Sequence, residues 1–230
     1  MPGGIVALFI LGVIVVIGFA IYAAYASAKR RNEIAAWALS KGLVFSQEKV
    51  RDVEYRFPFF DCLRQGSKRY ALNTMQGNYS GRGIFAFDYH YETTSTDSKG
   101  HQQTHHHYFS AVILFSKIPL KPLFIRPEGL FDKLAGLVGF EDINFESAEF
   151  SRRFFVKAPD RKWAYDVIHA RTIEFLLAMP QFKLQFDPQC VIAWRDARFE
   201  APEFEQAAEV IKGILDRLPE YVVKQQEGIS

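Results

Sequence analysis

Residues 5–24 read IVALFILGVIVVIGFAIYAA, a run of apolar, aromatic and small side chains without a charge. As a helix rising about 1.5 Å per residue, this run covers the ~30 Å hydrocarbon layer of a bilayer. The absence of charge extends over residues 1–28, and Lys29 carries the first charged side chain. The sequence therefore predicts an N-terminal transmembrane anchor over residues 1–28 that contacts the lipid bilayer through residues 5–24.

A cleaved signal peptide is the alternative interpretation of this segment. Ala24, Tyr25 and Ala26 supply a small-x-small cleavage triplet. However, the first four residues carry no positive side chain, and the apolar run is longer than the hydrophobic region of a normal signal peptide. These departures favour an anchor that remains in the mature protein.

The basic cluster Lys29, Arg30 and Arg31 directly follows the apolar run, whereas the N-terminal flank is uncharged. Positively charged flanks are retained on the cytoplasmic side. We therefore expect a single-pass protein of the plasma (inner) membrane with its N-terminus outside and its C-terminal domain in the cytosol. In that reducing compartment Cys62 and Cys190 remain free thiols.

The composition of the 230 residues, with 49% hydrophobic, 23% charged and 15% aromatic side chains, is typical of a globular protein and excludes a disordered one. The 28 Lys and Arg residues against 26 Asp and Glu leave a net charge of +2. This balance gives no reason to expect a nucleic-acid partner.

The segment 29–42 predicts a juxtamembrane helix, because apolar residues recur at helical spacing and Gly42 is a natural C-terminal stop. Trp37 lies about two turns past the basic cluster, so we expect it to dock onto the soluble domain rather than to anchor at the membrane surface. A cytosolic α+β domain follows over residues 43–223, with two subdomains meeting near residues 141–149 as an alternative to one unit. Residues 224–230 are polar and predict a flexible tail.

The clearest strand is 84–91, IFAFDYHY, in which aromatic side chains at the odd positions alternate with Ile84, Ala86, Asp88 and His90. Further strands and helices follow from the same reading of periodicity and of the Gly and Pro boundaries. Strands are predicted over 43–46, 70–75, 83–93, 106–117, 123–126, 150–157, 182–186 and 190–194, and helices over 127–137, 161–179 and 203–223. This order predicts an α+β fold in which a transmembrane helix precedes a mainly antiparallel sheet with packed amphipathic helices.

Histidines concentrate around the polar loop 94–104 and its flanking strands. If this hairpin pairs His90 with His107 and Glu92 with His105, the four side chains lie on one face within contact distance. Three imidazoles and a carboxylate suffice to bind Zn²⁺ or a similar divalent ion, so these four residues are the predicted metal ligands. A one-residue shift of register would separate them, and the alternative is a solvent-exposed polar hairpin without a metal.

Motifs of the familiar enzyme classes are absent from the sequence, which contains no GxSxG, HExxH or kinase signature. The Gly-rich stretch 76–83 lacks GK[ST] and precedes a predicted strand, which favours a hairpin turn over a phosphate-binding loop. Cys62 follows Asp61, whose charge raises the pKa of a thiol and argues against a thiolate nucleophile. Asp88 could act as an acid or base, although a polar sheet face explains it equally well.

Four segments in the order found here carry a resemblance to a known group of proteins. They are KGLVF at 41–45, GIFAFDYHY at 83–91, PLFIRPEGLFDKLAG at 122–136 and EFSRRFFVKAPD at 149–160. With the single N-terminal span, this layout resembles uncharacterised bacterial membrane-anchored proteins that have no assigned activity. The resemblance implies an architecture and no site residues.

Two functions remain open at this point. The anchor, the aromatic domain and the missing catalytic motifs favour a noncatalytic binding or scaffold module with a protein partner at the membrane. The alternative is a metal-dependent hydrolase or a metal sensor that uses the histidine hairpin.

Overall fold

The computed structural model describes residues 2–129 and 142–228. Eight strands form one sheet in the order β1-β2-β3-β4-β8-β7-β5-β6, and every pairing is antiparallel. The strands are β1 (Val44–Ser46), β2 (Ser67–Tyr79), β3 (Arg82–Thr96), β4 (Gln102–Phe115), β5 (Leu123–Pro127), β6 (Phe154–Lys157), β7 (Lys183–Phe186) and β8 (Cys190–Arg195). The helices are α1 (Pro2–Ser40), α2 (Val53–Arg56), α3 (Ala148–Arg153), α4 (Arg161–Val167), α5 (Ala170–Ala178), α6 (Ala201–Leu215) and α7 (Glu220–Glu227), with a short 3-10 helix, η1, at Asp61–Leu63. The predicted α+β class is confirmed.

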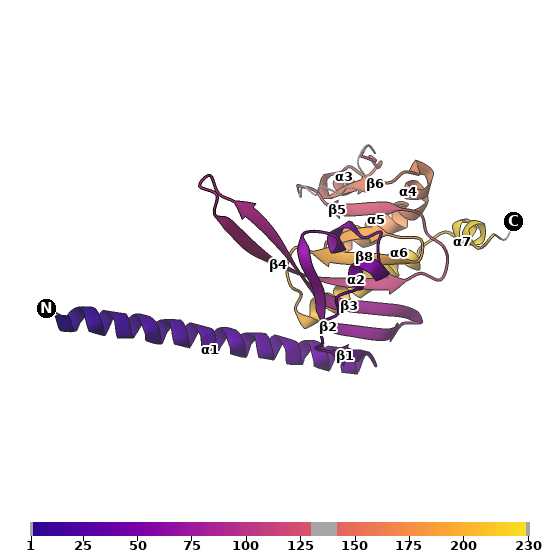
Figure 1. Ribbon diagram of the computed structural model, residues 1–230. Helices are drawn as coiled ribbons and strands as arrows, with labels where there is room; N and C mark the ends of the chain where they lie inside the picture. The colour runs from indigo at the N-terminus through magenta and orange to yellow at the C-terminus, as the bar shows by residue number, and fades with distance from the viewer. Residues whose placement is uncertain (1, 130–141, 229–230) are drawn as a thin grey trace.

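Helix α1 joins the apolar run and the predicted juxtamembrane segment in one unbroken helix of 39 residues. Among the described residues, one helix is long and apolar enough to cross a membrane, and it lies within α1 from Leu8 onward, where its apolar window is entirely exposed. The N-terminal half of α1 projects from the domain as a free rod (Figure 1). The helix ends at Ser40, just before the predicted stop at Gly42, whose φ of 69° lets the Leu43 amide bond back to the carbonyl of Ala38.

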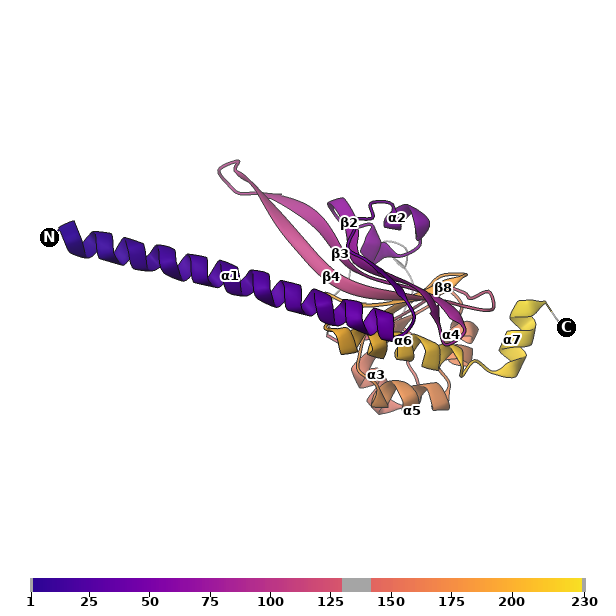
Figure 2. The same ribbon diagram turned by 90° about the horizontal axis from the view of Figure 1, so that it is seen from below.

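The alternation in β3 separates two faces of the sheet. Phe85, Phe87 and Tyr89 point to the aromatic face, which residues 50–66 with α2 and η1 cover. Ile84 and Ala86 point to the opposite α1/α6 face, where the C-terminal part of α1 packs together with α6. Figure 2 shows α1 and α6 on one side of β3 and β4 and α2 on the other. The core is therefore made of two apolar layers on either side of one sheet.

Strands β3 and β4 extend beyond the rest of the sheet as a two-stranded arm. The last pairing of β2 with β3 joins Ser67 to Glu92, whereas β3 and β4 stay paired up to Thr96 and Gln102. We call residues 93–105 the arm. It projects on the side from which the N-terminal half of α1 leaves the domain, whereas α7 lies at the opposite end (Figures 1 and 2).

The β2–β3 connection confirms the turn predicted for the Gly-rich stretch. Ser80 and Gly81 occupy its two central positions with φ values of 51° and 79°, and the Asn78 side chain accepts a hydrogen bond from the Gly81 amide. Both φ values are left-handed, as the favoured two-residue hairpin turn requires.

Several predicted elements were wrong in extent. The strand expected over 150–157 is strand only from Phe154, because Ser147 caps helix α3 ahead of it. The single helix expected over 161–179 is broken between α4 and α5. The one expected over 203–223 is broken after Leu215, and α7 begins only after Pro219, its N-cap. The helix expected over 127–137 begins on residues that complete β5, and its part from 130 onward lies outside the described residues.

Two predicted boundaries can be compared with the described elements. Strands from both sides of residues 141–149 join the same sheet, since β5 pairs with β6 and with β7. Helix α7 runs to Glu227 and so includes the first four residues of the predicted tail.

Candidate functional site at the root of the arm

A row of buried polar side chains runs along the α1/α6 face of the two longest strands toward the arm. Its members are Asp88, His90 and Glu92 on β3 and Ser110 on β4, all at most 9% exposed. Buried polar groups destabilise a protein unless they find partners. The hydrogen-bond partners of these side chains therefore indicate the role of this part of the sheet.

Asp88 of β3 begins the row and pairs with Arg30 of α1. We call this pair of side chains the latch. The guanidinium of Arg30 bonds both carboxylate oxygens of Asp88, with N–O distances of 2.8 and 2.9 Å, and its Nε donates to the Phe199 carbonyl at 2.8 Å. Asn73 and Ser110 also donate to the Asp88 carboxylate. The side chains of Arg30 and Asp88 are 14% and 1% exposed. Both carboxylate oxygens of Asp88 are engaged in these bonds, so its side chain holds α1 against the sheet.

A bulge in β2 supplies a further hydrogen bond to the Asp88 carboxylate of the latch. The pairing register of β2 with β3 shifts between Leu72 and Met75, and Asn73 in this bulge has a left-handed φ of 50°. Bulges redirect a side chain, and asparagine tolerates this backbone conformation better than most residues. The bulge lets the Asn73 amide reach Asp88 at 2.8 Å.

The last turns of α1 pack into the domain beyond the latch. Ile34 and Ala38 are fully buried, and the ring of Trp37 stacks on Phe204 of α6 at a centroid distance of 6.0 Å. The Trp37 indole also donates to Glu205 at 3.2 Å. The predicted docking of Trp37 onto the domain is confirmed, and the last turns of α1 and the domain form one packed body.

The register assumed for the histidine hairpin was wrong by one residue. His90 pairs with Tyr108 and Glu92 pairs with His106, so His106 joins His90 and Glu92 on one face. His105 and His107 face the other way, where His107 stacks on Tyr91 at 4.7 Å. The hairpin turn explains the shift, because it closes between Asp97 and His101, an odd number of residues that moves every partner by one.

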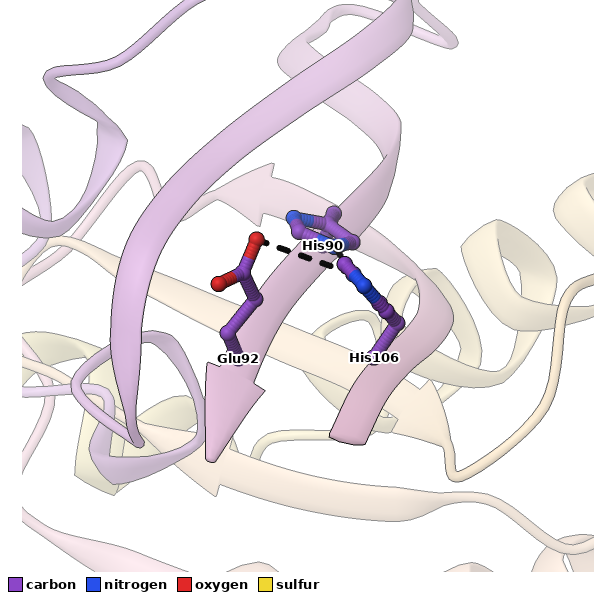
Figure 3. Close-up of side chains that lie close together, drawn as sticks. All are labelled: His90, Glu92 and His106. Atoms are coloured by element: carbon purple, nitrogen blue, oxygen red, sulfur yellow. Dashed lines mark hydrogen bonds and ion pairs between the residues drawn. The ribbon is translucent and has the colours of Figure 1, made fainter. Parts of the chain in front are cut away.

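His90, Glu92 and His106 form a compact group at the root of the arm, which we call the triad (Figure 3). His90 Nε2 lies 3.1 Å from His106 Nδ1, and this nitrogen lies 3.6 Å from Glu92 Oε1. One nitrogen from each ring and a carboxylate oxygen all lie within 4.8 Å of one another. The second oxygen of Glu92 binds Lys68 Nζ at 2.8 Å.

Electrostatics set the charge state of the triad. Burial is the largest effect on the pKa of His90 and lowers it, and the nearby His106 lowers it further. A backbone hydrogen bond with Lys68 and the charge of Glu92 act in the opposite direction but do not outweigh burial. The hydrogen bond from Lys68 lowers the pKa of the Glu92 carboxyl. Near neutral pH the triad therefore offers a neutral His90 ring and a charged carboxylate.

The triad opens into a hollow of about 300 Å³. Lysines, arginines and two tyrosines line it together with the triad. The residues are Lys49, Arg51, Lys68, Arg69, Tyr70, His90, Glu92, His106 and Tyr108. Lys49 lies over the ring of Tyr70 at 4.2 Å, and Arg69 pairs with Glu54 at 3.1 Å. The hollow thus surrounds the triad with positive charge.

Both thiols lie away from the triad, in the layer on the aromatic face. Cys62 and Cys190 are free and only 2% exposed. Burial is the largest cause that raises the pKa of each thiol, and Asp61 raises that of Cys62 further. Neither cysteine is arranged as a nucleophile.

The latch could not be predicted from local sequence patterns, because Arg30 and Asp88 lie 58 residues apart in the sequence. A signal was nevertheless present, since an aspartate in the middle of IFAFDYHY must find a buried cationic partner. The sequence assigns Arg30 to the membrane flank with Lys29 and Arg31, whereas the structure pairs its side chain with Asp88 at 14% exposure. Lys29 remains exposed at 64% of its side chain, as a flank residue should.

The fold of the chain is similar to that of a known protein. No family model and no curated protein matches the chain. The crystal structure of the mycobacterial trehalose monomycolate transport factor A, TtfA, is similar to the chain with a TM-score of 0.62 and 14% sequence identity. The match covers 81% of this chain and 93% of that one. At this identity the likeness shows that the chain shares the fold of TtfA.

Proposed function

We propose that this chain is a single-pass membrane protein whose domain acts as a noncatalytic binding module beside a second membrane protein. The observation that carries the proposal is the continuity of α1, which leads from an exposed apolar rod into the latch and the core without a linker. An apolar helix of this length is costly to expose to water and is stabilised by lipid.

The orientation proposed is that of the sequence analysis, with the domain on the cytoplasmic side. Lys29 remains at the surface beside the end of the apolar run, and Arg31 follows it, so positive charge lies on the domain side of the rod. Positive flanks of this kind are retained in the cytoplasm.

The arm is the surface proposed to meet the partner. It projects on the same side as the rod, and its residues 94–105 are exposed. A ribbon of two strands leaves backbone donors and acceptors free along both edges, which another protein can pair with. Its Thr, Ser, Gln and His side chains are too polar for the hydrocarbon layer, which favours a protein partner over insertion into lipid.

The likeness to TtfA supports one class of partner. The name of that protein describes a factor in the transport of trehalose monomycolate. A module held close to the membrane with an extended arm suits an accessory subunit of a membrane transporter, and we propose this role for the present chain.

Photo-crosslinking in intact membranes tests the partner. A photoreactive phenylalanine analogue at Thr94 or Gln103 on the arm is expected to capture one recurring integral membrane protein. The same analogue at Gln225, exposed on α7 at the far end, is the matched control and should not capture it. Equal capture from Gln225, or none from the arm, would contradict the proposal.

Thiol labelling tests the orientation. In a Gln225→Cys variant the new thiol is exposed, whereas Cys62 and Cys190 are buried and give little background. A membrane-impermeant maleimide should label the variant only after the cells are opened. Labelling of intact cells would place the domain outside and overturn the orientation.

A further inference from the structure

We propose that His90, Glu92 and His106 bind one divalent transition-metal ion of the zinc class. This site differs from the one expected from the sequence by the exchange of two histidines for His106, and it does not depend on the proposed role at the membrane. Two imidazole nitrogens and one carboxylate are a common ligand set for zinc sites that keep one position open.

Two of the three donor–donor distances within the triad are close to those around a metal, and the third is within 4.8 Å. Two ligands bound tetrahedrally at 2.0–2.1 Å from zinc lie about 3.4 Å apart. The His90–His106 nitrogen distance is 3.1 Å and the distance from His106 to the Glu92 oxygen is 3.6 Å, on either side of that value. Small rotations of side chains would complete the geometry.

The donor atoms converge in a partly enclosed place. His90 and Glu92 are 3% and 9% exposed, and His90 Nε2 faces His106 Nδ1. A metal needs the free lone pair of an imidazole nitrogen, and it would replace this contact between the two rings by two metal–nitrogen bonds.

The surrounding cations set the strength and the fourth ligand of the site. Lys68 holds the outer oxygen of Glu92, and Lys49 and Arg51 line the same hollow. Their charge opposes a dication and weakens its binding. The same charge favours an anion, such as hydroxide or phosphate, in the open position of the bound metal.

Binding would also brace the arm. Glu92 lies at the last pairing of β2 with β3, and His106 lies opposite on β4. A metal bound to both would crosslink the two strands at the point where the three-stranded part of the sheet becomes a two-stranded ribbon. Such ribbons have little stability of their own.

Metal titration of the full chain in detergent micelles, purified without a histidine tag, tests the proposal. Co²⁺ is expected to produce the visible absorption of a tetrahedral site at one ion per chain, and Zn²⁺ should displace it. Hydrogen exchange of the arm amides should slow when Zn²⁺ is added. No absorption and no heat of binding at micromolar metal would overturn the proposal.

Variants separate this site from adventitious binding by surface histidines. His106→Gln removes a ligand whose side chain is 55% exposed, so the fold should survive, and the affinity for Zn²⁺ should fall at least about 10-fold. His105→Gln on the opposite face is the matched control and should leave the affinity unchanged. Lys68→Met should tighten binding about 10-fold by removing a neighbouring charge. Equal loss in both histidine variants, or weaker binding in Lys68→Met, would contradict the site.

Discussion

Removing the charge of Asp88 should detach the last turns of α1 from the sheet. Asp88→Asn keeps the size of the side chain but leaves the Arg30 guanidinium without its ionic partner. Breaking a buried ion pair from one side costs about 3–5 kcal/mol. Because 14% of the Arg30 side chain is exposed and water can reach it, we expect the lower value, about 3 kcal/mol.

Urea denaturation of the full chain in micelles, followed by tryptophan fluorescence, measures this loss. With a dependence of about 3 kcal/mol per molar urea, the midpoint should fall by about 1 M. Lys29→Met is the matched control, since Lys29 is the adjacent residue but lies 3.9 Å from Glu33 at the surface, and its effect should stay below about 0.5 kcal/mol.

A double-mutant cycle isolates the pair from its neighbours. The combined change Arg30→Met and Asp88→Leu should cost less than the sum of the single changes by at least about 1.5 kcal/mol. Additive effects, or an Asp88→Asn variant no less stable than Lys29→Met, would refute the latch as a stabilising contact between α1 and the sheet.

Three further predictions concern other parts of the domain. Burial lowers the pKa of His90 below the unfolded value of 6.5, so the unfolded chain binds the proton more readily and stability falls as the pH drops below 6.5. His90→Gln should flatten this slope in pH-dependent denaturation, whereas His105→Gln should keep it. A Cβ at Gly213 of α6 would lie 2.1 Å from the Phe175 ring, so Gly213→Ala should cost about 1–3 kcal/mol in a denaturation assay, and adding Phe175→Leu should recover part of the loss. Cys62 should resist a thiol reagent at pH 8 in the folded protein and react fully in denaturant, and rapid reaction in the folded state would show that the aromatic face opens.

The fold class and the faces of β3 follow from local patterns in the sequence. Alternation over 84–91 separates the aromatic layer from the α1/α6 layer because a strand has a period of two. The ends of helices were harder to predict. Pro219 separates α6 from α7, and a proline is a known helix breaker. The apolar residues on both sides of it nevertheless follow helical spacing, which favoured one continuous helix.

The register of the arm could not be predicted from the sequence. It depends on whether the polar loop closes over an odd or an even number of residues, and several arrangements of Asp97, Lys99 and Gly100 have similar turn propensities. In the structure the Asp97 carboxylate accepts hydrogen bonds from the backbone amides of Lys99 and His101, and these bonds stabilise one arrangement of the loop. That local choice decides which histidine faces Glu92.

The unbroken course of α1 also fixes an angle. Each residue of an α-helix advances the chain by about 1.5 Å along the helix axis and rotates it by about 100° around that axis. Inserting a single alanine between the apolar run and Arg30 would thus lift the domain slightly and swing the arm by more than a quarter of a circle around the rod. The number of residues between the apolar run and Arg30 therefore sets the direction in which the arm points. This number is constrained even where the identities of the residues are not.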